Sequence, residues 1–479
     1  MAGEAMGKWI RGLSVLSLLL AVAAPVQALT DAQARHLLVR SGFDRPPADY
    51  QRWLKADREE AVARLLSDTR TDPALAAPDW AEAPVLSVYN EVQRSGEPRA
   101  QVSKRVRQQQ SQWQRELEEW LLANTVLSEH PLAERMTAFW HNRFTSSFTK
   151  VGNAQLLYRQ HMFLRRHALG NFETLLRGIV RDPAMLIYLD NRQNRKDHPN
   201  ENLARELLEL FSLGEGHYTE QDIREAARAL SGWSLDGDLA FQIRTRQHDA
   251  GEKVIFGQRG RFDGDDLVSL ILQQPATAEF LVAALWREFI SPQPDPQLVS
   301  RWAAQLREQH YEIQPLLETI FLSDAFWDPR HRGVLIKSPL QLVAGTLRAF
   351  SIAPRDYRPL VVAMRRMGQW LLNPPNVKGW PGYTDWIDAS RWLTRRSFLH
   401  RLLSTPQGPA QGGAMDNPMR SGGVLQTDAA PPALYGTGMA RSRLQSLLLV
   451  SAPVQPLPPG ATREATIKHW ALDPVYQLY

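Results

Sequence analysis

Apolar residues recur through most of the chain at the three- and four-residue spacing of an amphipathic α-helix. The longest predicted helix covers residues 101–122, and Pro131 stands at the first position of a helix over residues 132–144. Thr219 and Asp263 each begin a capping box ahead of an apolar stripe. Further helices are expected over residues 31–38, 58–66, 172–180, 201–213, 277–290, 296–309, 314–326, 339–350, 359–372 and 388–403. The pattern therefore predicts a mainly α fold.

Strand signals are few. Residues 241–243 and 253–256 are apolar enough for strands and flank the turn-forming residues 249–251, which predicts one small β-hairpin lying on the helices. Residues 404–439 contain five Pro and seven Gly, a composition typical of a flexible insertion or lid. No internal repeat is evident, which argues against a regular solenoid.

The N-terminal segment has the pattern of a signal peptide. Lys8 and Arg11 precede an apolar run at residues 13–24, and small residues at 26 and 28 fit the site that signal peptidase reads. As a helix this run is about 18 Å long, shorter than the ~30 Å hydrocarbon core of a bilayer. A cleaved signal peptide over residues 1–28 is therefore favoured over an uncleaved anchor. We expect an exported protein, periplasmic or extracellular, with no permanent membrane span.

Composition excludes several classes of site. The formal net charge is +5, from 56 Lys and Arg against 51 Asp and Glu that are interspersed along the chain, so nucleic-acid binding is disfavoured. The absence of cysteine excludes disulfides, thiolate metal sites and a cysteine nucleophile. The signatures of serine hydrolases, phosphate-binding loops and zinc proteases are also absent from the sequence.

Several blocks of residues, taken in order, resemble one bacterial family of secreted proteins. The blocks are FWHN at 139–142, YLDN at 188–191, NENLARELLELFSLG at 200–214, YTE at 218–220, Gly232-Trp233, His248-Asp249 with Lys253 and Gly257, and PPNVKGWP at 374–381. The family is catalogued as domain of unknown function 1800, and the resemblance extends from about Asp31 to residues 472–478. Because it covers nearly the whole mature chain, the resemblance implies one large multi-helix domain over residues 29–479 that carries the insertion at 404–439. Members commonly carry a second histidine where this chain has Arg143, which weakens any metal site that needs both imidazoles.

The resemblance implies no established activity. Genes of the family often stand beside those of a second exported family that looks related to sulfatases and alkaline phosphatases. The resemblance therefore implies that the chain binds, or helps to mature, a sulfatase-like partner protein. The alternative is an extracytoplasmic hydrolase that acts on a polysaccharide or another polymer through histidine, carboxylate and amide side chains.

A hydrolytic site would draw on the candidate catalytic residues His141, Asp190, Glu206 and His248. His141 ends an apolar helical pattern, where a hydrogen-bonded core histidine is the commoner role. Glu206 shares a helix stripe with Asn202 and lies near the apolar face, so burial with a partner is expected. If His141, Glu206 and His248 met, they could hold a divalent metal ion with an open position, although their spacing gives this metal site little support.

Polar residues in the other blocks have both binding and structural interpretations. Asp190 and Asn191 could join a network at the N-terminus of the next helix, which favours an anion, or simply build turns. Asp249 is expected to form a turn rather than to orient His248. The candidate binding residues are Asn142, Asn191, Asn202, Asp249, Lys253, Asn376, Lys378 and Trp380.

The segment 376–382 is predicted to be a rigid turn that presents Lys378 and Trp380. Trp380, Tyr383 and Trp386 could form an aromatic platform for a sugar ring or a partner side chain. Packing of these rings to close the fold between two helices is at least as compatible with the sequence. The sequence alone leaves both roles open.

Overall fold

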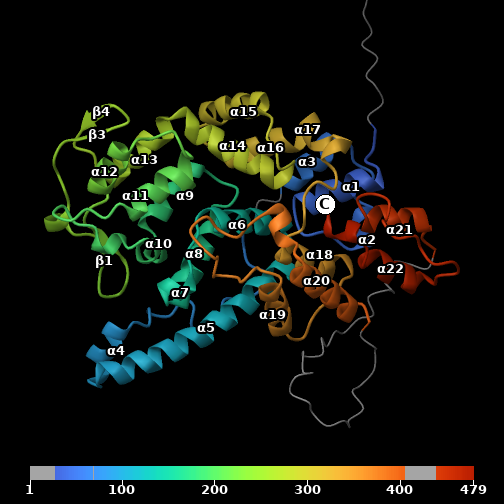
Figure 1. Ribbon diagram of the computed structural model, residues 1–479, viewed down its shortest axis with the longest axis horizontal. Helices are drawn as coiled ribbons and strands as arrows, with labels where there is room; N and C mark the ends of the chain where they lie inside the picture. Colours follow the sequence, from blue (N-terminus) through green and yellow to red (C-terminus); the bar gives the residue numbers. More distant parts are fainter. Residues whose placement is uncertain (1–26, 68–69, 405–437) are drawn as a thin grey trace, which may run out of the picture.

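In the computed structural model the chain forms a succession of mostly short helices arranged beside one long helix, α5 (Arg99–Leu127) (Figure 1). The structure describes residues 27–67, 70–404 and 438–479. Almost all of the predicted signal peptide, and most of the predicted insertion at 404–439, therefore lie outside the described residues. Helices dominate the part of the chain that is described, which confirms the predicted mainly α fold.

The helices before the first strand are α1 (Asp31–Arg40), α2 (Pro47–Tyr50), α3 (Arg58–Ser67), α4 (Val88–Ser95), α5, α6 (Pro131–Arg143), α7 (Phe148–Val151), α8 (Ala154–Arg166), α9 (Phe172–Arg181), α10 (Pro183–Tyr188), α11 (Asn202–Glu206) and α12 (Glu220–Ala229). Those after the last strand are α13 (Gly264–Gln273), α14 (Pro275–Phe289), α15 (Pro296–Glu308), α16 (Ile313–Leu322), α17 (Asp324–Trp327), α18 (Pro339–Ala349), α19 (Arg358–Arg366), α20 (Ala389–Leu402), α21 (Arg441–Leu448) and α22 (Arg463–Ala471). Short 3-10 turns cover Asn191–Gln193, Thr245–Gln247, Pro329–His331, Tyr383–Trp386 and Pro474–Gln477, and a π-helical segment, η2 (Leu207–Ser212), continues α11.

Side-chain caps fix where several helices begin. The predicted capping boxes of Thr219 with Asp222 and of Asp263 with Asp266 are both present. Each satisfies two backbone N–H groups that the first helical turn leaves without a partner. At α1 the N-cap residue is Thr30. Asp31 follows it and provides a carboxylate in the first turn of the helix.

The predicted hairpin is wrong in its pairing. Strand β2 (Phe241–Ile243) pairs with β1 (Trp233–Leu235), and β3 (Lys253–Ile255) pairs with β4 (Gln258–Gly260), so two separate hairpins replace one. Phe256 and Gly257 both have positive φ angles, 50° and 76°, at the tight turn that joins β3 to β4. Such a turn matches the twist of adjacent strands, which favours pairing with the strand that follows at once.

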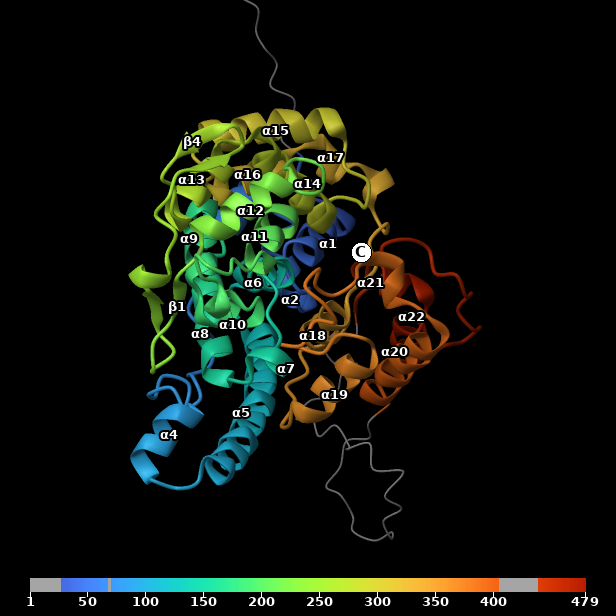
Figure 2. The ribbon, with the colours of Figure 1, turned by 60° about the vertical axis from the view of Figure 1, so that its left-hand side comes forward.

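Two hydrophobic clusters hold the helices together. The larger includes buried side chains of α1, α3, α6 and α8 to α16, while the smaller is built mainly by α18 to α22. The long helix α5 contributes to both, through Leu117 and Trp120 on one side and Leu122 and Val126 on the other. Figures 1 and 2 show α18 to α22, in orange and red, beside the green and yellow helices of the larger cluster. The boundary between the clusters is where the cavities described below lie.

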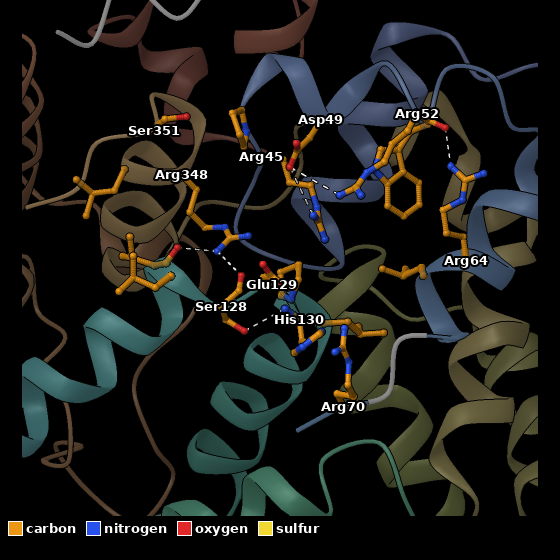
Figure 3. Close-up of a pocket in the computed structure, with 18 of the residues that line it drawn as sticks. Arg45, Asp49, Arg52, Arg64, Arg70, Ser128, Glu129, His130, Arg348 and Ser351 are labelled. Carbon is orange, nitrogen blue, oxygen red and sulfur yellow. Dashed lines mark hydrogen bonds and ion pairs between the residues drawn. The ribbon is translucent and has the colours of Figure 1, made fainter. Parts of the chain in front are cut away.

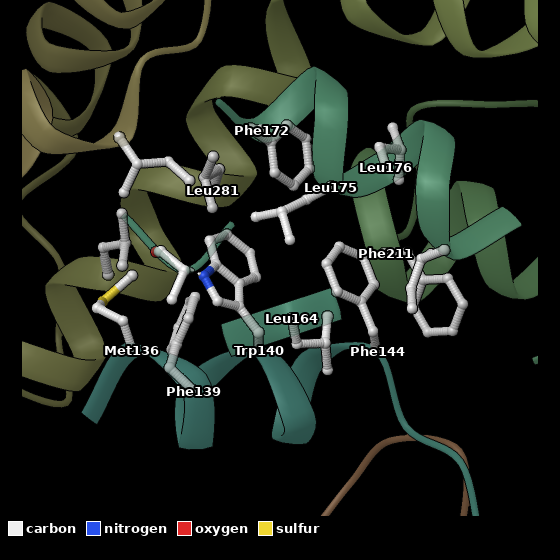
Figure 4. Packing of buried hydrophobic residues seen from close by; sticks show 14 of the residues in the cluster. Met136, Phe139, Trp140, Phe144, Leu164, Phe172, Leu175, Leu176, Phe211 and Leu281 are labelled. Atoms are coloured by element: carbon white, nitrogen blue, oxygen red, sulfur yellow. Dashed lines mark hydrogen bonds between the residues drawn. The ribbon is translucent and has the colours of Figure 1, made fainter. Parts of the chain in front are cut away.

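An aromatic group on α6 is the centre of the larger cluster (Figure 4). Trp140 is fully buried, stacks on Phe144 with 5.5 Å between ring centroids and lies 4.8 Å from the ring of Phe139. Its Nε1 donates a hydrogen bond of 2.9 Å to the carbonyl oxygen of Ala168. This packing fixes the end of α6, from which the candidate site begins.

Within the described residues, no single helix has both the length and the apolar character needed to cross a bilayer. Only α13 and α14 together reach that length and hydropathy, and they are bent by 75° at the residue between them.

Replacing Trp140 by alanine removes the largest side chain of the aromatic group and leaves a cavity. We expect Trp140→Ala to lower the free energy of unfolding by about 3–5 kcal/mol. Leu393, whose side chain is 64 % exposed on α20, provides the control, and Leu393→Ala should change stability by less than about 0.5 kcal/mol. Urea denaturation followed by circular dichroism measures both variants, and equal losses would contradict the central role of Trp140.

Candidate functional site: a basic cleft where two sequence blocks meet

The segment that follows α6 is tied to a loop more than two hundred residues later in the chain. We call residues 372–382 the junction loop. Phe148 donates its backbone N–H to the carbonyl of Leu372 at 2.8 Å, and the Thr145 hydroxyl donates to the carbonyl of Val377 at 2.5 Å. The side-chain oxygen of Asn373 accepts hydrogen bonds from both the backbone and the hydroxyl of Thr149. These bonds satisfy buried backbone groups and hold the loop in one position.

Asn142 makes the closest contact across this junction. Its side-chain oxygen accepts the backbone N–H of Trp380 at 2.7 Å. Gly379 has a φ of +91°, and a Cβ atom there would lie 2.4 Å from the same oxygen. Only glycine fits both the left-handed backbone and this close approach. The two blocks FWHN and PPNVKGWP therefore meet in space, and Asn142 joins them.

A cleft of about 310 Å³ opens beside this contact, between the end of α6, α14 and the junction loop. Its walls carry the cations Arg143, Arg287 and Lys378. Glu288 also lines it but forms an ion pair with Arg135, with 2.7 Å between Oε1 and Nε. The Nζ of Lys378 lies 3.6 Å from Oε1 of Glu215, a residue outside the cleft lining. Among the described residues no carboxylate pairs with Arg143 or Arg287, so these two arginines give the cleft an excess of positive charge.

The position of Arg143 is electrostatically unfavourable in the absence of an anion. Burial and the nearby Arg287 guanidinium lower the pKa of Arg143 to about 9, so the side chain stays charged at neutral pH. Its guanidinium carbon lies 4.1 Å from the ring centroid of Phe280, which gives a cation–π contact but no countercharge. The chemistry of this wall therefore favours a carboxylate or another oxyanion.

Beneath the cleft is a smaller cavity of about 50 Å³ that shares Leu340, Gln369 and Trp380 with it. His141 and His161 line this cavity, and the Nε2 of His141 lies 2.9 Å from the Nδ1 of His161 in a hydrogen bond. Burial lowers the pKa of His141 to about 4, and burial with the neighbouring His141 and Arg165 lowers that of His161 well below its ordinary value. Both rings are therefore neutral at pH 7, one donating and the other accepting.

Among the residues that the structure describes, the Nε2 of His161 has no hydrogen-bond partner, although the residue is only 5 % exposed. A neutral imidazole of this kind can offer or accept one hydrogen bond, which suits a water molecule or a polar ligand atom in the cavity. It is a poor acid or base near pH 7 because protonation is strongly disfavoured. Glu134, which also lines the cavity, is 2.6 Å from the Nη1 of Arg165 in a buried ion pair.

Glu206 lies at the end of α11, close to the junction loop. Burial and the carboxylate of Glu209 raise its pKa, while the ammonium of Lys378 acts in the opposite direction. Arg205 pairs with Glu201 and Glu220, and Glu209 accepts a hydrogen bond from the hydroxyl of Tyr218 at 2.9 Å. The change from α to π geometry at Leu207 alters which side chains share a face beyond Glu206.

Asp190 forms an ion pair with a lysine of α7. Its Oδ2 lies 2.6 Å from the Nζ of Lys150 on α7, and its own φ is +57°. The Lys150 ammonium is 6.0 Å from the ring centroid of Tyr188, whose pKa is raised by burial and by Glu206. Asp190 and Glu206 do not line the cleft, whereas Lys378 is part of its wall.

Asn191 and the His248 block belong to a separate, structural cluster. Asn191 is buried and donates to the carbonyls of Leu230 and Trp233. His248 bonds through Nδ1 to the carbonyl of Ser231, and Asp249 forms an ion pair of 2.7 Å with Arg228, which confirms that Asp249 does not orient His248. The Nζ of Lys253 donates to the carbonyls of Asp249 and Gly251. None of these side chains lines the basic cleft.

The remaining candidates divide between turns and packing. Asn202 is exposed, and its backbone N–H donates to the side-chain oxygen of Asn200. The side-chain oxygen of Asn376 accepts the backbone N–H of Lys378 in the predicted turn. Trp380 and Trp386 are 9 % and 5 % exposed, so their rings pack into the fold and do not form an open platform.

The candidate residues do not all gather into one pocket. His141, Asn142, Lys378 and Trp380 meet at the cleft and the cavity beneath it, but His248 bonds elsewhere. Across the described residues no group of three or more histidine and acidic side chains is arranged to hold a metal ion, so the site suggested from His141, Glu206 and His248 is not formed. Sequence reasoning missed His161, although Tyr158, His161 and Arg165 follow one another at helical spacing on one face of α8.

One known family of proteins matches the chain over the part that contains the site. The model of a family described as "Protein of unknown function (DUF1800)" matches residues 36–472, which include every residue of the cleft and the histidine cavity except Tyr479. No curated protein and no solved structure matches the chain.

Gly379 offers a direct test of the junction. In Gly379→Ala the new Cβ collides with Asn142 and the left-handed backbone is strained, so we expect the junction loop to detach and the backbone amide of Trp380 to exchange with solvent about tenfold faster or more. Gly382→Ala is the matched control, because no atom lies within 4 Å of a Cβ built at Gly382. Hydrogen exchange read by mass spectrometry compares the two variants, and an unchanged rate in Gly379→Ala would show that the contact does not hold the loop.

The histidine pair should make stability depend on pH. Because the pKa of His141 is about 4 in the folded chain against 6.5 for a free side chain, only the unfolded chain binds this proton between those values. The free energy of unfolding should therefore fall as pH is lowered from about 6.5 to about 4. Burial raises the pKa values of Glu118 and Asp182 to about 7, and these groups act in the opposite direction.

Comparison with His141→Gln isolates the histidine contribution, because Glu118 and Asp182 titrate in both proteins. The variant should lose less stability than the parent over this pH interval in thermal or urea unfolding. Identical pH dependence in the two proteins would contradict a buried, neutral His141.

Proposed function

The chain belongs to the DUF1800 family, and on that premise we propose that it is an exported, non-catalytic binding protein. Its partner, in this proposal, is a secreted protein of the sulfatase and alkaline-phosphatase type, which the chain holds or helps to mature. The family resemblance supports the choice of partner through the frequent neighbourhood of the two kinds of gene. The signal-peptide pattern of residues 1–28 supports export to the periplasm or beyond.

The basic cleft is the observation that carries this proposal. Arg143 and Lys378 stand on either side of the contact between Asn142 and the junction loop, and Arg287 completes the charged wall. A set of cations in one wall is suited to an acidic side chain or a short acidic segment of a partner, because the charges of the two surfaces are then complementary. A volume of about 310 Å³ accommodates such an anchor.

A hydrolytic function is less well supported by the same geometry. A general acid or base should have a pKa near the working pH and lie within hydrogen-bond reach of the substrate. His141 and His161 are neutral and shielded, Asp190 is paired with Lys150, and His248 bonds to a backbone carbonyl. The pKa of Glu206 is raised, but Glu206 does not line the cleft, and Glu288, which does, is paired with Arg135. The geometry therefore favours binding over catalysis.

Charge reversal in the cleft tests the proposal. We expect the mature chain to be recovered with a secreted sulfatase-like protein when the two are co-expressed and captured from the periplasmic fraction. Arg287→Glu combined with Lys378→Glu should weaken that association by about tenfold or more, because like charges would then meet across the interface.

The matched control is Lys104→Glu combined with Arg107→Glu, which reverses two charges on the exposed side of α5. The dissociation constant of the purified pair, measured by biolayer interferometry, should be unchanged in this control. Failure of the parent chain to associate with the partner, or equal binding by both double variants, would refute the proposed role of the cleft.

A further inference from the structure

The small cavity beneath the basic cleft has two buried polar atoms without a hydrogen-bond partner in its lining side chains. We call this cavity, of about 50 Å³, the histidine cavity; side chains of α5, α6 and α8 line it, together with Leu340 and residues before and within the junction loop. The Nε2 of His161 and the Nε1 of Trp380 make no hydrogen bond to any residue that the structure describes. These residues are only 5 % and 9 % exposed. Because one water molecule needs about 10–15 Å³, the cavity can hold a group of several non-hydrogen atoms.

Other polar side chains in the wall already have partners within the fold. The hydroxyls of Thr125 and Thr137 donate to backbone carbonyls one turn earlier in α5 and α6, at 3.0 and 2.7 Å. The side-chain oxygen of Gln369 accepts the backbone N–H of Leu340 at 2.8 Å, which fixes that side chain in the wall. Leaving a buried donor or acceptor without a partner is costly, so the imidazole and indole nitrogens are the atoms that a ligand would satisfy.

The charges around the histidine cavity are balanced. Burial lowers the pKa of His141 to about 4 and that of His161 well below its ordinary value, so neither ring is charged at pH 7. Among the described residues of the wall, Glu134 is the only acidic one, and its Oε1 lies 2.6 Å from the Nη1 of Arg165 in a buried ion pair. An ion that entered the cavity would lose its hydration without gaining a free countercharge, whereas a neutral polar group needs only hydrogen bonds.

The two unpartnered atoms define the group that fits. The indole Nε1 of Trp380 can only donate, whereas the Nε2 of a neutral His161 donates or accepts according to the role of its Nδ1 in the bond to His141. A primary amide has an acceptor oxygen and two N–H donors, so it can pair with both nitrogens in either arrangement. A carboxylate offers acceptors only and brings a charge, and an alkyl group would leave both nitrogens unpaired.

We propose that the histidine cavity binds the primary amide of an asparagine or glutamine side chain of the partner protein. The inference rests on the proposed function, since the cavity is continuous with the basic cleft in which an acidic group of that partner is expected. The two share the lining residues Ala138, Leu340, Gln369 and Trp380. The anchor of the partner then combines a carboxylate at the arginines of the cleft with a neutral amide in the adjoining cavity.

Two probes of the same shape test the cavity without the partner. Acetamide has the end group of an asparagine or glutamine side chain, and acetate replaces that amide by a carboxylate. In NMR titrations of the mature chain we expect acetamide to shift the ring signals of His161 with a millimolar Kd, which is usual for so small a ligand. Acetate should bind there about tenfold more weakly or less. His161 is the reporter because it lines the histidine cavity and not the basic cleft, and its signals are those lost in His161→Gln.

Trp380→Phe keeps an aromatic ring in the wall but removes the indole donor, so it should weaken acetamide binding by about fivefold. The matched control is Trp392→Phe on α20, at a half-buried side chain that lines neither the cleft nor the cavity. Leu371→Phe gives a second variant if the first fails to fold. Leu371 lines the histidine cavity but not the cleft, so the larger side chain should displace acetamide while the arginines of the cleft are unchanged. It should also weaken binding of the partner by about fivefold in biolayer interferometry.

The inference is overturned if acetamide does not bind, if acetate binds at His161 as tightly as acetamide, or if Trp380→Phe and Leu371→Phe both bind acetamide like the control. It is also overturned if Leu371→Phe loses acetamide but keeps the full affinity for the partner, because the partner would then place no amide in the cavity. These results are distinct from a parent chain that does not associate with the partner at all, which refutes the proposed function itself.

Discussion

The hydrogen bond from the Trp380 backbone to the side chain of Asn142 is the constraint on which the candidate site depends. It joins residues 238 positions apart and brings the end of α6 against the junction loop. Because Gly379 has no Cβ, the loop can approach Asn142 at a distance that any other residue would prevent. The cleft has Arg143 on one of these segments and Lys378 on the other, so its shape exists only while the two are held together.

The cavities lie where the two hydrophobic clusters meet. The basic cleft has Phe139 of the larger cluster and Leu340 of the smaller one in its walls. A second cavity, whose lining is shown in Figure 3, has Trp53 and Val126 from the same two sources. Each cluster is packed within itself, whereas the boundary between them is filled by long, charged side chains whose apolar stems cover core surface. This arrangement explains why cations gather there and why they are only partly matched by carboxylates.

Local signals in the sequence predicted the helices well, because periodicity and capping act within a few residues. Thr219 and Asp263 begin the helices that their capping boxes indicate. The strand pairing failed because β2 and β3 are three residues long and contain too little apolar surface to specify a partner. The tight turn at Phe256 and Gly257 favours the pairing of β3 with β4, because it brings these strands together over a shorter connection than the one between β2 and β3.

The candidate site was predictable only in part, since its residues are distant along the chain. The sequence blocks indicated Asn142, Lys378 and Trp380, but they did not reveal that His248 bonds to a backbone carbonyl. His161 and the arginines of the second cavity escaped notice because arginine and histidine are common on exposed helix faces, and only the packing of distant helices buries them. A sequence pattern reports which face of a helix is apolar, whereas the absence of a countercharge is a property of three-dimensional neighbours. The unmatched cations at the boundary are therefore visible only in the folded chain, and they are the features that most directly indicate an anionic partner.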